Sequence, residues 1–265
     1  MTMKTFQTLR VDRLDGGLML VTLNRPEVRN ATNTQMGREL RELFVPLKFT
    51  PGEVRCVVIT GAGDKAFCAG GDLKERNGMT DETWRLQHAI FEEAFYAIID
   101  CSVPVIAAVN GAAFGGGLEM ALCCDFIYAA KGVRLALTEV RLGIMPGGCG
   151  TQNLPRAVGN RRAKELILTA LPFTAEEGYE WGMINRVCEP AELLSQALAT
   201  ARRICENAPL SVRQAKKSID YGTQMDIHSA VVFEVQAYER MISTEDRHEG
   251  VRAFNEKRTP NFKGR

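Results

Sequence analysis

The chain has 265 residues, of which 45% are hydrophobic and 25% are charged, a balance typical of a globular protein with a sizeable core. Lys and Arg total 33 against 32 Asp and Glu, and this formal net charge of +1 argues against intrinsic disorder and against nucleic-acid binding through bulk positive charge. No apolar signal segment opens the sequence, and the longest apolar run, Val103–Cys124, is broken by polar residues and glycines, so no membrane span is predicted.

The first part of the chain alternates apolar strands with helices. In chain order, the pattern predicts a strand at Leu18–Leu23, a helix at Asn33–Leu47, a strand at Val54–Thr60, a helix ending near Asp100 and a strand at Val103–Val109. Because such an alternation needs crossover connections, it predicts a largely parallel sheet in an α/β fold.

After about residue 161 the pattern becomes helical. The predicted helices are Arg161–Ala170, Ala175–Trp181, Ala191–Asn207, Leu210–Tyr221, Ile227–Ile242 and Thr244–Asn255. The fifth of these carries an apolar stripe, with Val231, Val235 and Tyr238 on one face. We expect these helices to pack on the first region or on a neighbouring subunit.

The eight cysteines form no CxxC pair and have no histidine at metal-site spacing. This spacing predicts reduced thiols, a cytoplasmic protein and no metal site. The three histidines, His88, His228 and His248, fall in charged helical segments away from the glycine clusters, so none is given a role.

Two glycine-rich turns, at 65–74 and 110–122, each follow a buried strand. In the second, three glycines lead into a helix, so Gly116 and Gly117 lie where free N–H groups point outward. Together the turns could place one amide each on a single developing oxyanion. The alternative is two tight turns with close backbone packing, since neither matches a dinucleotide fingerprint or a phosphate loop.

Two glutamates lie in apolar sequence beside these turns. Glu119 falls in the first turn of the predicted helix, and Glu139 is flanked by apolar residues. They could flank one site as acid and base, with the helix favouring ionised Glu119 and a drier site raising the pKa of Glu139. The alternatives are a helix-dipole carboxylate for Glu119 and an ion pair with Arg134 or Arg141 for Glu139.

Several segments together resemble one family. They are LNRPEVRNA (23–31), KAFCAGGDLKE (65–75), PVIAAVNGAAFGGGLEMALCCD (104–125), LTEVRLGIMPGGCGTQNLPRAVG (137–159) and EGVRAFNEKRTPNFKGR (249–265). They are similar to the hydratase branch of the enoyl-CoA hydratase/isomerase (crotonase) superfamily, in register over essentially the whole chain.

The resemblance implies an α/β fold made of a crotonase-like spiral of β-β-α turns with a C-terminal helical trimerisation region. Residues 1–200 would form the spiral core with the coenzyme A and active sites, and residues 201–265 the trimerisation region of a homotrimer or hexamer. The substrate would be an acyl-CoA thioester. No separate cofactor is implied, because coenzyme A is part of the substrate.

The resemblance also implies the roles of individual residues. The amides of Gly71 and Gly116 would hold the thioester oxygen, while Glu119 serves chiefly as base and Glu139 chiefly as acid on one shared water. The implied coenzyme A contacts are Glu27, Val28, Arg29, Ala69, Gly70, Asp72 and Leu73, with Phe262 and Lys263 contributed by a neighbouring chain.

Some positions depart from the family pattern. Gly71 stands where hydratases often have alanine, Cys149 interrupts a glycine run, and Asn153 replaces a frequent arginine. The last two could reshape the acyl pocket. The string LKER at 73–76 is similar to that of methylglutaconyl-type hydratases.

The predicted function is therefore hydration of the 2,3 double bond of a short- or medium-chain enoyl-CoA. The rivals are a methylglutaconyl-CoA hydratase, a carnitinyl-CoA-type dehydratase and an enoyl-CoA isomerase. From other classes, we consider a silent scaffold and an RNA-binding protein using the basic clusters at 161–164 and 213–217, against which the near-zero net charge argues.

Overall fold

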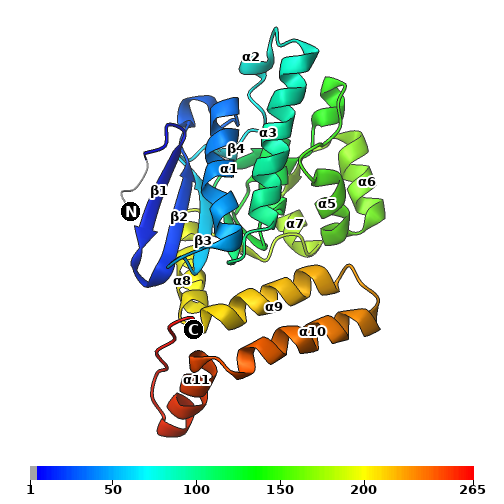
Figure 1. Ribbon diagram of the computed structural model, residues 1–265. Helices are drawn as coiled ribbons and strands as arrows, with labels where there is room; N and C mark the ends of the chain where they lie inside the picture. Colours follow the sequence, from blue (N-terminus) through cyan, green and yellow to red (C-terminus); the bar gives the residue numbers. More distant parts are fainter. Residues whose placement is uncertain (1–4) are drawn as a thin grey trace.

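The computed structural model describes residues 5–265 and contains two sheets with helices around them (Figure 1). The six-stranded sheet has the order β1 (Leu9–Leu14), β2 (Leu18–Leu23), β3 (Cys56–Gly61), β5 (Val105–Val109), β7 (Phe126–Ala130) and β10 (Arg186–Cys188). The four-stranded sheet has the order β4 (Ala66–Cys68), β6 (Ala112–Phe114), β8 (Arg134–Ala136) and β9 (Phe173–Thr174). Neighbours are parallel except for the β1–β2 and β8–β9 pairs.

The two sheets are built together as the chain advances. The pairs β3–β4, β5–β6 and β7–β8 each place their first strand in the larger sheet and their second in the smaller one. Helices follow each pair: α2 (Leu73–Arg76) and α3 (Asp81–Ile99), then α4 (Gly116–Leu122), then α5 (Gly150–Val158) and α6 (Asn160–Thr169). This confirms the predicted spiral of β-β-α turns.

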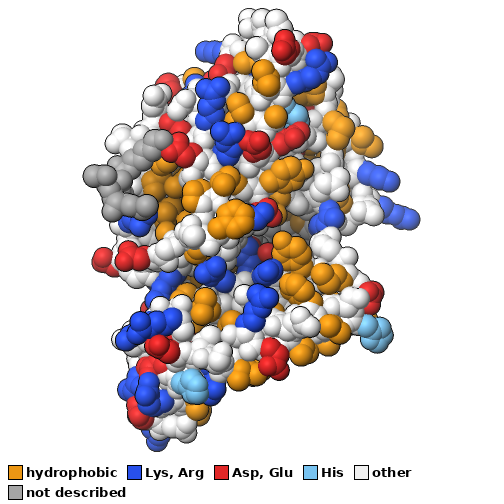
Figure 2. Space-filling view, viewed as in Figure 1, with side chains coloured by type: hydrophobic (Ala, Val, Ile, Leu, Met, Phe, Trp, Pro, Cys, Tyr) orange, Lys and Arg blue, Asp and Glu red, His pale blue; other side chains and the backbone are white. Residues whose placement is uncertain are grey.

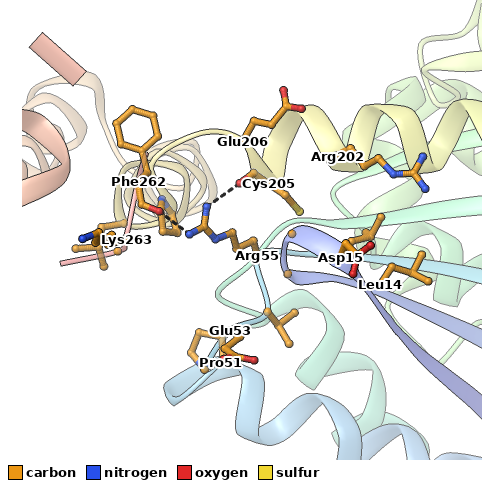
Figure 3. Close-up of a pocket in the computed structure, with 18 of the residues that line it drawn as sticks. Leu14, Asp15, Pro51, Glu53, Arg55, Arg202, Cys205, Glu206, Phe262 and Lys263 are labelled. Carbon is orange, nitrogen blue, oxygen red and sulfur yellow. Dashed lines mark hydrogen bonds between the residues drawn. The ribbon is translucent and has the colours of Figure 1, made fainter. Parts of the chain in front are cut away.

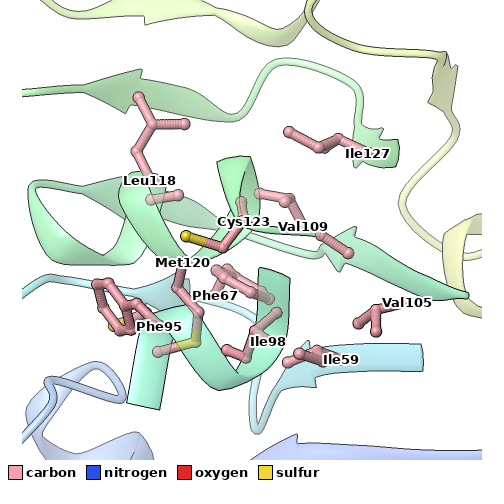
Figure 4. Packing of buried hydrophobic residues seen from close by; sticks show 14 of the residues in the cluster. Ile59, Phe67, Phe95, Ile98, Val105, Val109, Leu118, Met120, Cys123 and Ile127 are labelled. Carbon is pink, nitrogen blue, oxygen red and sulfur yellow. The ribbon is translucent and has the colours of Figure 1, made fainter. Parts of the chain in front are cut away.

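One face of the larger sheet is covered by α1 (Thr34–Phe49) and α3, which pack on each other. Each begins at a polar cap, because the side chains of Asn33 and Thr80 accept hydrogen bonds from backbone amides of their first turns. Figure 4 shows the apolar side chains gathered beneath, among them Ile59, Phe95 and Ile98, all nearly inaccessible to solvent. This core fixes α3 over the strand ends that carry the candidate site.

The opposite face of the larger sheet is covered by α8 (Leu193–Cys205), which follows the short helix α7 (Ala175–Glu180) and β10. Leu193, Ala197, Ala201 and Cys205 recur every four residues along α8 and are buried against strand residues such as Val58. The larger sheet therefore has both faces buried, which explains why β2, β3 and β5 consist almost entirely of apolar residues.

The chain then leaves the core in three helices, α9 (Pro209–Gly222), α10 (Ile227–Ile242) and α11 (Glu245–Glu256). A largely buried ion pair between Lys216 Nζ and Asp125 Oδ2, 2.8 Å long, connects α9 to the core. The predicted stripe on α10 is exposed, with Val235 at 52% and Tyr238 at 69% accessibility. Apolar side chains lie open on the visible face of these helices (Figure 2).

Within residues 5–265, no helix combines the length and the apolar character that crossing a membrane would require.

Candidate active site

The two predicted glycine turns meet in the structure. A methyl group built on Gly116 would lie 3.9 Å from the amide nitrogen of Gly71, and one built on Gly70 would lie 3.4 Å from the amide nitrogen of Gly116. Among residues 5–265, neither the Gly71 nor the Gly116 N–H has a hydrogen-bond acceptor. Two neighbouring backbone donors are thus free to bind one oxygen atom.

The conformation of the second turn depends on its glycines. Gly115 adopts φ 51° and ψ −128°, a region that side chains disfavour, and a methyl group there would also lie 3.0 Å from Glu139 Oε1. Gly117 packs directly on the carbonyl of Cys68, which leaves no room for a side chain. The run of three glycines therefore allows the conformation of the turn, which leaves one amide free. It also allows the close contact between the two turns.

Glu119 is buried at the start of α4, and its side chain is held by backbone amides of a third glycine-rich segment. Its Oε1 accepts hydrogen bonds from the amides of Gly148 and Gly150, both 2.8 Å long. The ring of Phe95, on α3, also packs against Gly148. The carboxylate is therefore fixed in one orientation.

Burial raises the pKa of Glu119 to about 7, and the charge of Glu139 adds to that rise. The two backbone hydrogen bonds oppose the rise without cancelling it. The sequence indicated that the helix would favour ionised Glu119; in the structure, loss of water around the carboxylate outweighs its two amide hydrogen bonds, so the pKa rises. The group titrates near neutrality, as an acid–base catalyst should.

Glu139 begins a single 3-10 turn, η3 (Glu139–Leu142), and is 8% exposed. Neither of its buried carboxylate oxygens has a hydrogen-bond partner in residues 5–265, so ion pairs with Arg134 and Arg141 are excluded. Burial raises the pKa of Glu139, as expected, while the nearby backbone N–H groups of Glu139 and Thr138 and the charge of Arg76 lower it in part. A buried carboxyl without a partner is costly, which is typical of a group kept for a ligand.

The predicted coenzyme A contacts on the N-terminal side also come together. The Ala69 amide donates to the Arg29 carbonyl over 3.0 Å, so the segment 27–29, in and after η2 (Pro26–Val28), lies against the turn at 69–73. Beside it, Asp72 accepts from Arg25 over 2.9 Å and caps α2. Backbone groups of both segments thus border the free amide of Gly71.

Phe262 and Lys263 lie elsewhere in the chain. They line a cavity of about 820 Å³ between the β1–β2 turn, the ends of α8 and α9 and the C-terminal tail (Figure 3). Arg55 crosses this cavity to donate to the carbonyls of Cys205 and Phe262. Neither Glu119 nor Glu139 lines it, so within one chain the structure does not join these two predicted contacts to the carboxylate site.

The sequence did not reveal several residues of the site. The Gly148 and Gly150 amides and the Phe95 ring could not be assigned, because only the fold brings them to Glu119. His88 was expected to lie away from the glycine clusters, but its ring contacts the backbone at Gly147. The sequence predicted no role for Arg76, which was noted only within the string LKER, although its guanidinium lies over Gly71.

All eight cysteines are unpaired. Within residues 5–265, no cluster of three or more His, Cys, Asp or Glu side chains is arranged to hold a metal ion.

Comparisons with known proteins identify the family of this chain. The family model described as enoyl-CoA hydratase/isomerase matches residues 13–265. The chain is 41% identical to a short-chain-enoyl-CoA hydratase of Clostridium acetobutylicum (92% of this chain, 93% of that protein) and 40% identical to a crotonyl-CoA hydratase of Syntrophomonas wolfei (92% and 94%). A crystal structure of an enoyl-CoA hydratase from Bacillus anthracis superimposes with a TM-score of 0.95 at 42% identity, covering 98% of this chain and 100% of that one. The chain belongs to the enoyl-CoA hydratase/isomerase family, within the crotonase superfamily.

Proposed function

We propose that this protein is an enoyl-CoA hydratase that adds water across the 2,3 double bond of a short- or medium-chain enoyl-CoA. The observation that carries the proposal is the pair of buried glutamates beside two free amides. Both carboxyl groups have raised pKa values, and Glu139 has no hydrogen-bond partner within residues 5–265. Relatives named as hydratases at 40 to 41% identity support the same reaction.

In this mechanism the thioester oxygen accepts hydrogen bonds from the Gly71 and Gly116 amides, which form the oxyanion hole. Ionised Glu119 takes a proton from a water molecule as its oxygen bonds to C3. The π electrons move toward the thioester oxygen, where the two amides stabilise the resulting enolate. Protonated Glu139 then delivers a proton to C2. Because the charge of Glu139 acts on Glu119, the two carboxyl groups titrate as a coupled pair.

Coenzyme A enters as part of the substrate, and we propose no separate cofactor and no metal. Its contacts would be Glu27–Arg29 and Ala69–Leu73, and the hydrogen bond from the Ala69 amide to the Arg29 carbonyl supports a joint role for the two segments. Phe262 and Lys263 would act on the site of a neighbouring chain in a homotrimer or hexamer. The exposed apolar stripe of α10, with Val235 and Tyr238, supports such an assembly.

We also propose a cytoplasmic setting, which the eight unpaired cysteines support.

The other crotonase-type reactions remain the alternative, and substrate assays separate them. RNA binding is less well supported, because two residues of the basic clusters have structural partners. Arg162 stacks on Trp181 with its guanidinium 4.3 Å from the ring centre, and Lys216 pairs with Asp125.

The test is to follow the conjugated-thioester absorbance of crotonyl-CoA and the mass of the product. Loss of absorbance with a mass gain of one water supports hydration. Protein that binds the thioester but produces neither change would contradict the proposal. A shifted double bond without a mass gain would indicate an isomerase.

A further inference from the structure

Arg76 at the end of α2 extends over the oxyanion turn. Its guanidinium carbon would lie 3.2 Å from a methyl group on Gly71, the residue whose amide is free. The side chain also acts electrostatically on Glu139, because each charge shifts the pKa of the other group. Arg76 therefore borders the acyl side of the site, between an oxyanion donor and one of the two carboxyl groups.

The Arg76 guanidinium is held in place by uncharged groups. It stacks on the ring of Trp84 at 4.3 Å and lies 5.5 Å from the ring centre of Phe91. Its Nε donates to Gln87 Oε1 over 2.8 Å. These contacts come from the first half of α3, so the plane of the guanidinium is fixed by a helix that is itself anchored in the core.

The two terminal nitrogens of Arg76 have no hydrogen-bond acceptor in residues 5–265, and no carboxylate there lies within ion-pair distance of them. The acidic neighbours that act on its charge are Glu75 and Glu139. Glu75 is already engaged, since its Oε2 accepts from the Thr34 amide and the Gln87 side chain. Burial lowers the pKa of Arg76, and the charges of Glu75 and Glu139 offset this effect only in part.

We infer that Arg76 binds a carboxylate carried on the acyl chain, so that the preferred substrates are enoyl-CoA thioesters with a second, terminal carboxyl group. This deepens the hydratase proposal and rests on it. A planar guanidinium with one edge fixed and the other open matches the two oxygens of a carboxylate. With the thioester oxygen on Gly71 and Gly116, an acyl chain passing Glu139 reaches this edge.

The test measures binding, which does not depend on turnover. By calorimetry, glutaryl-CoA and butyryl-CoA are compared on the intact protein; the two differ in a terminal carboxylate, and neither carries a double bond to hydrate. We expect glutaryl-CoA to bind about tenfold or more tightly than butyryl-CoA. In Arg76→Met the ratio of the two affinities should fall to near one. Arg76→Lys keeps the charge but not the planar group that can bind both carboxylate oxygens, so it should give an intermediate ratio.

The matched control is Arg85→Met on α3, whose side chain is 76% exposed, and it should retain the wild-type ratio. Equal affinities in the wild type, or a ratio that Arg76→Met leaves unchanged, would overturn the inference. An equal loss of affinity for free coenzyme A in Arg76→Met would also overturn it, by assigning Arg76 to a coenzyme phosphate. Failure to hydrate crotonyl-CoA would contradict the proposed function alone, because the ratio of the two affinities is measured without turnover.

Discussion

Glu119 and Glu139 face the same site, but only Glu119 is held by hydrogen bonds. Two amides fix the Glu119 carboxylate, whereas no hydrogen bond within residues 5–265 fixes that of Glu139. The charge of Glu139 contributes to the raised pKa of Glu119, so the two groups titrate in each other's presence. This asymmetry suits a fixed Glu119 that positions the water and a Glu139 whose carboxyl group can shift as it delivers its proton.

The pH dependence of kcat/KM should report the Glu119 carboxyl group. Because Glu119 must be ionised to act as base and its pKa is about 7, the rate should rise with pH through a midpoint near pH 7. It should fall again at higher pH, where Glu139 loses the proton that it must donate. An ordinary glutamate would place this midpoint near pH 4.5. Initial rates with crotonyl-CoA across this range give the profile. A rate already level at about pH 5 would contradict the account.

The same carboxyl group should make the folded protein less stable as pH rises. A glutamate whose pKa is raised in the folded state holds its proton more tightly there, so stability falls between the unfolded and folded pKa values. Relative to Glu119→Gln, the wild type should lose roughly 2 to 3 kcal/mol of unfolding free energy between about pH 5 and about pH 8. Urea unfolding at one fixed protein concentration measures this. A constant difference between the two proteins would show that Glu119 is not strongly perturbed.

Gly150→Ala should impair turnover through the position of Glu119. The new methyl group would lie 2.8 Å from Glu119 Oε1, so the carboxylate must move. We expect kcat to fall by about tenfold or more, since small displacements of a catalytic group are costly. Gly250→Ala is the matched control, because its methyl group meets only ordinary contacts at 3.5 Å or more. Similar activity in both variants would argue against precise placement of Glu119.

The exposed stripe of α10 should be an interface between copies of the chain. Light scattering should give a mass of three or six times 29.3 kDa. A double variant, Val231→Glu with Val235→Glu, should lower that mass, because both side chains are about half exposed in one chain and would be buried in the assembly. Leu168→Glu on α6, at an apolar residue that is even more exposed, should leave the mass unchanged. A monomeric wild type would refute this prediction.

Much of the fold could be predicted because apolar periodicity is strong where elements are long or fully buried. The predicted strand Leu18–Leu23 and helix Ile227–Ile242 coincide with β2 and α10. The strands of the smaller sheet have two or three residues each, too few to show a period, so β4, β6, β8 and β9 were not predicted.

The site was predictable only in part, for a different reason. Glu119 and Glu139 stood out as carboxylates in apolar sequence beside glycine turns. The pKa of Glu119 was not predictable, because it depends on how much water the folded core removes. Arg76 was likewise hidden, since its place over Gly71 follows from the packing of α2 on α3, which no local pattern records.

The central claim is that the two glutamates act as one unit on one water. The measurement that tests it most directly is crotonyl-CoA hydration by Glu119→Gln, Glu139→Gln and the double variant, with exposed Glu180→Gln as control. We predict that each single variant loses about 10²- to 10⁴-fold in kcat and that the double variant loses little more than either, as expected of groups acting together. A single variant that keeps most of its activity, or losses that multiply in the double variant, would contradict the paired mechanism.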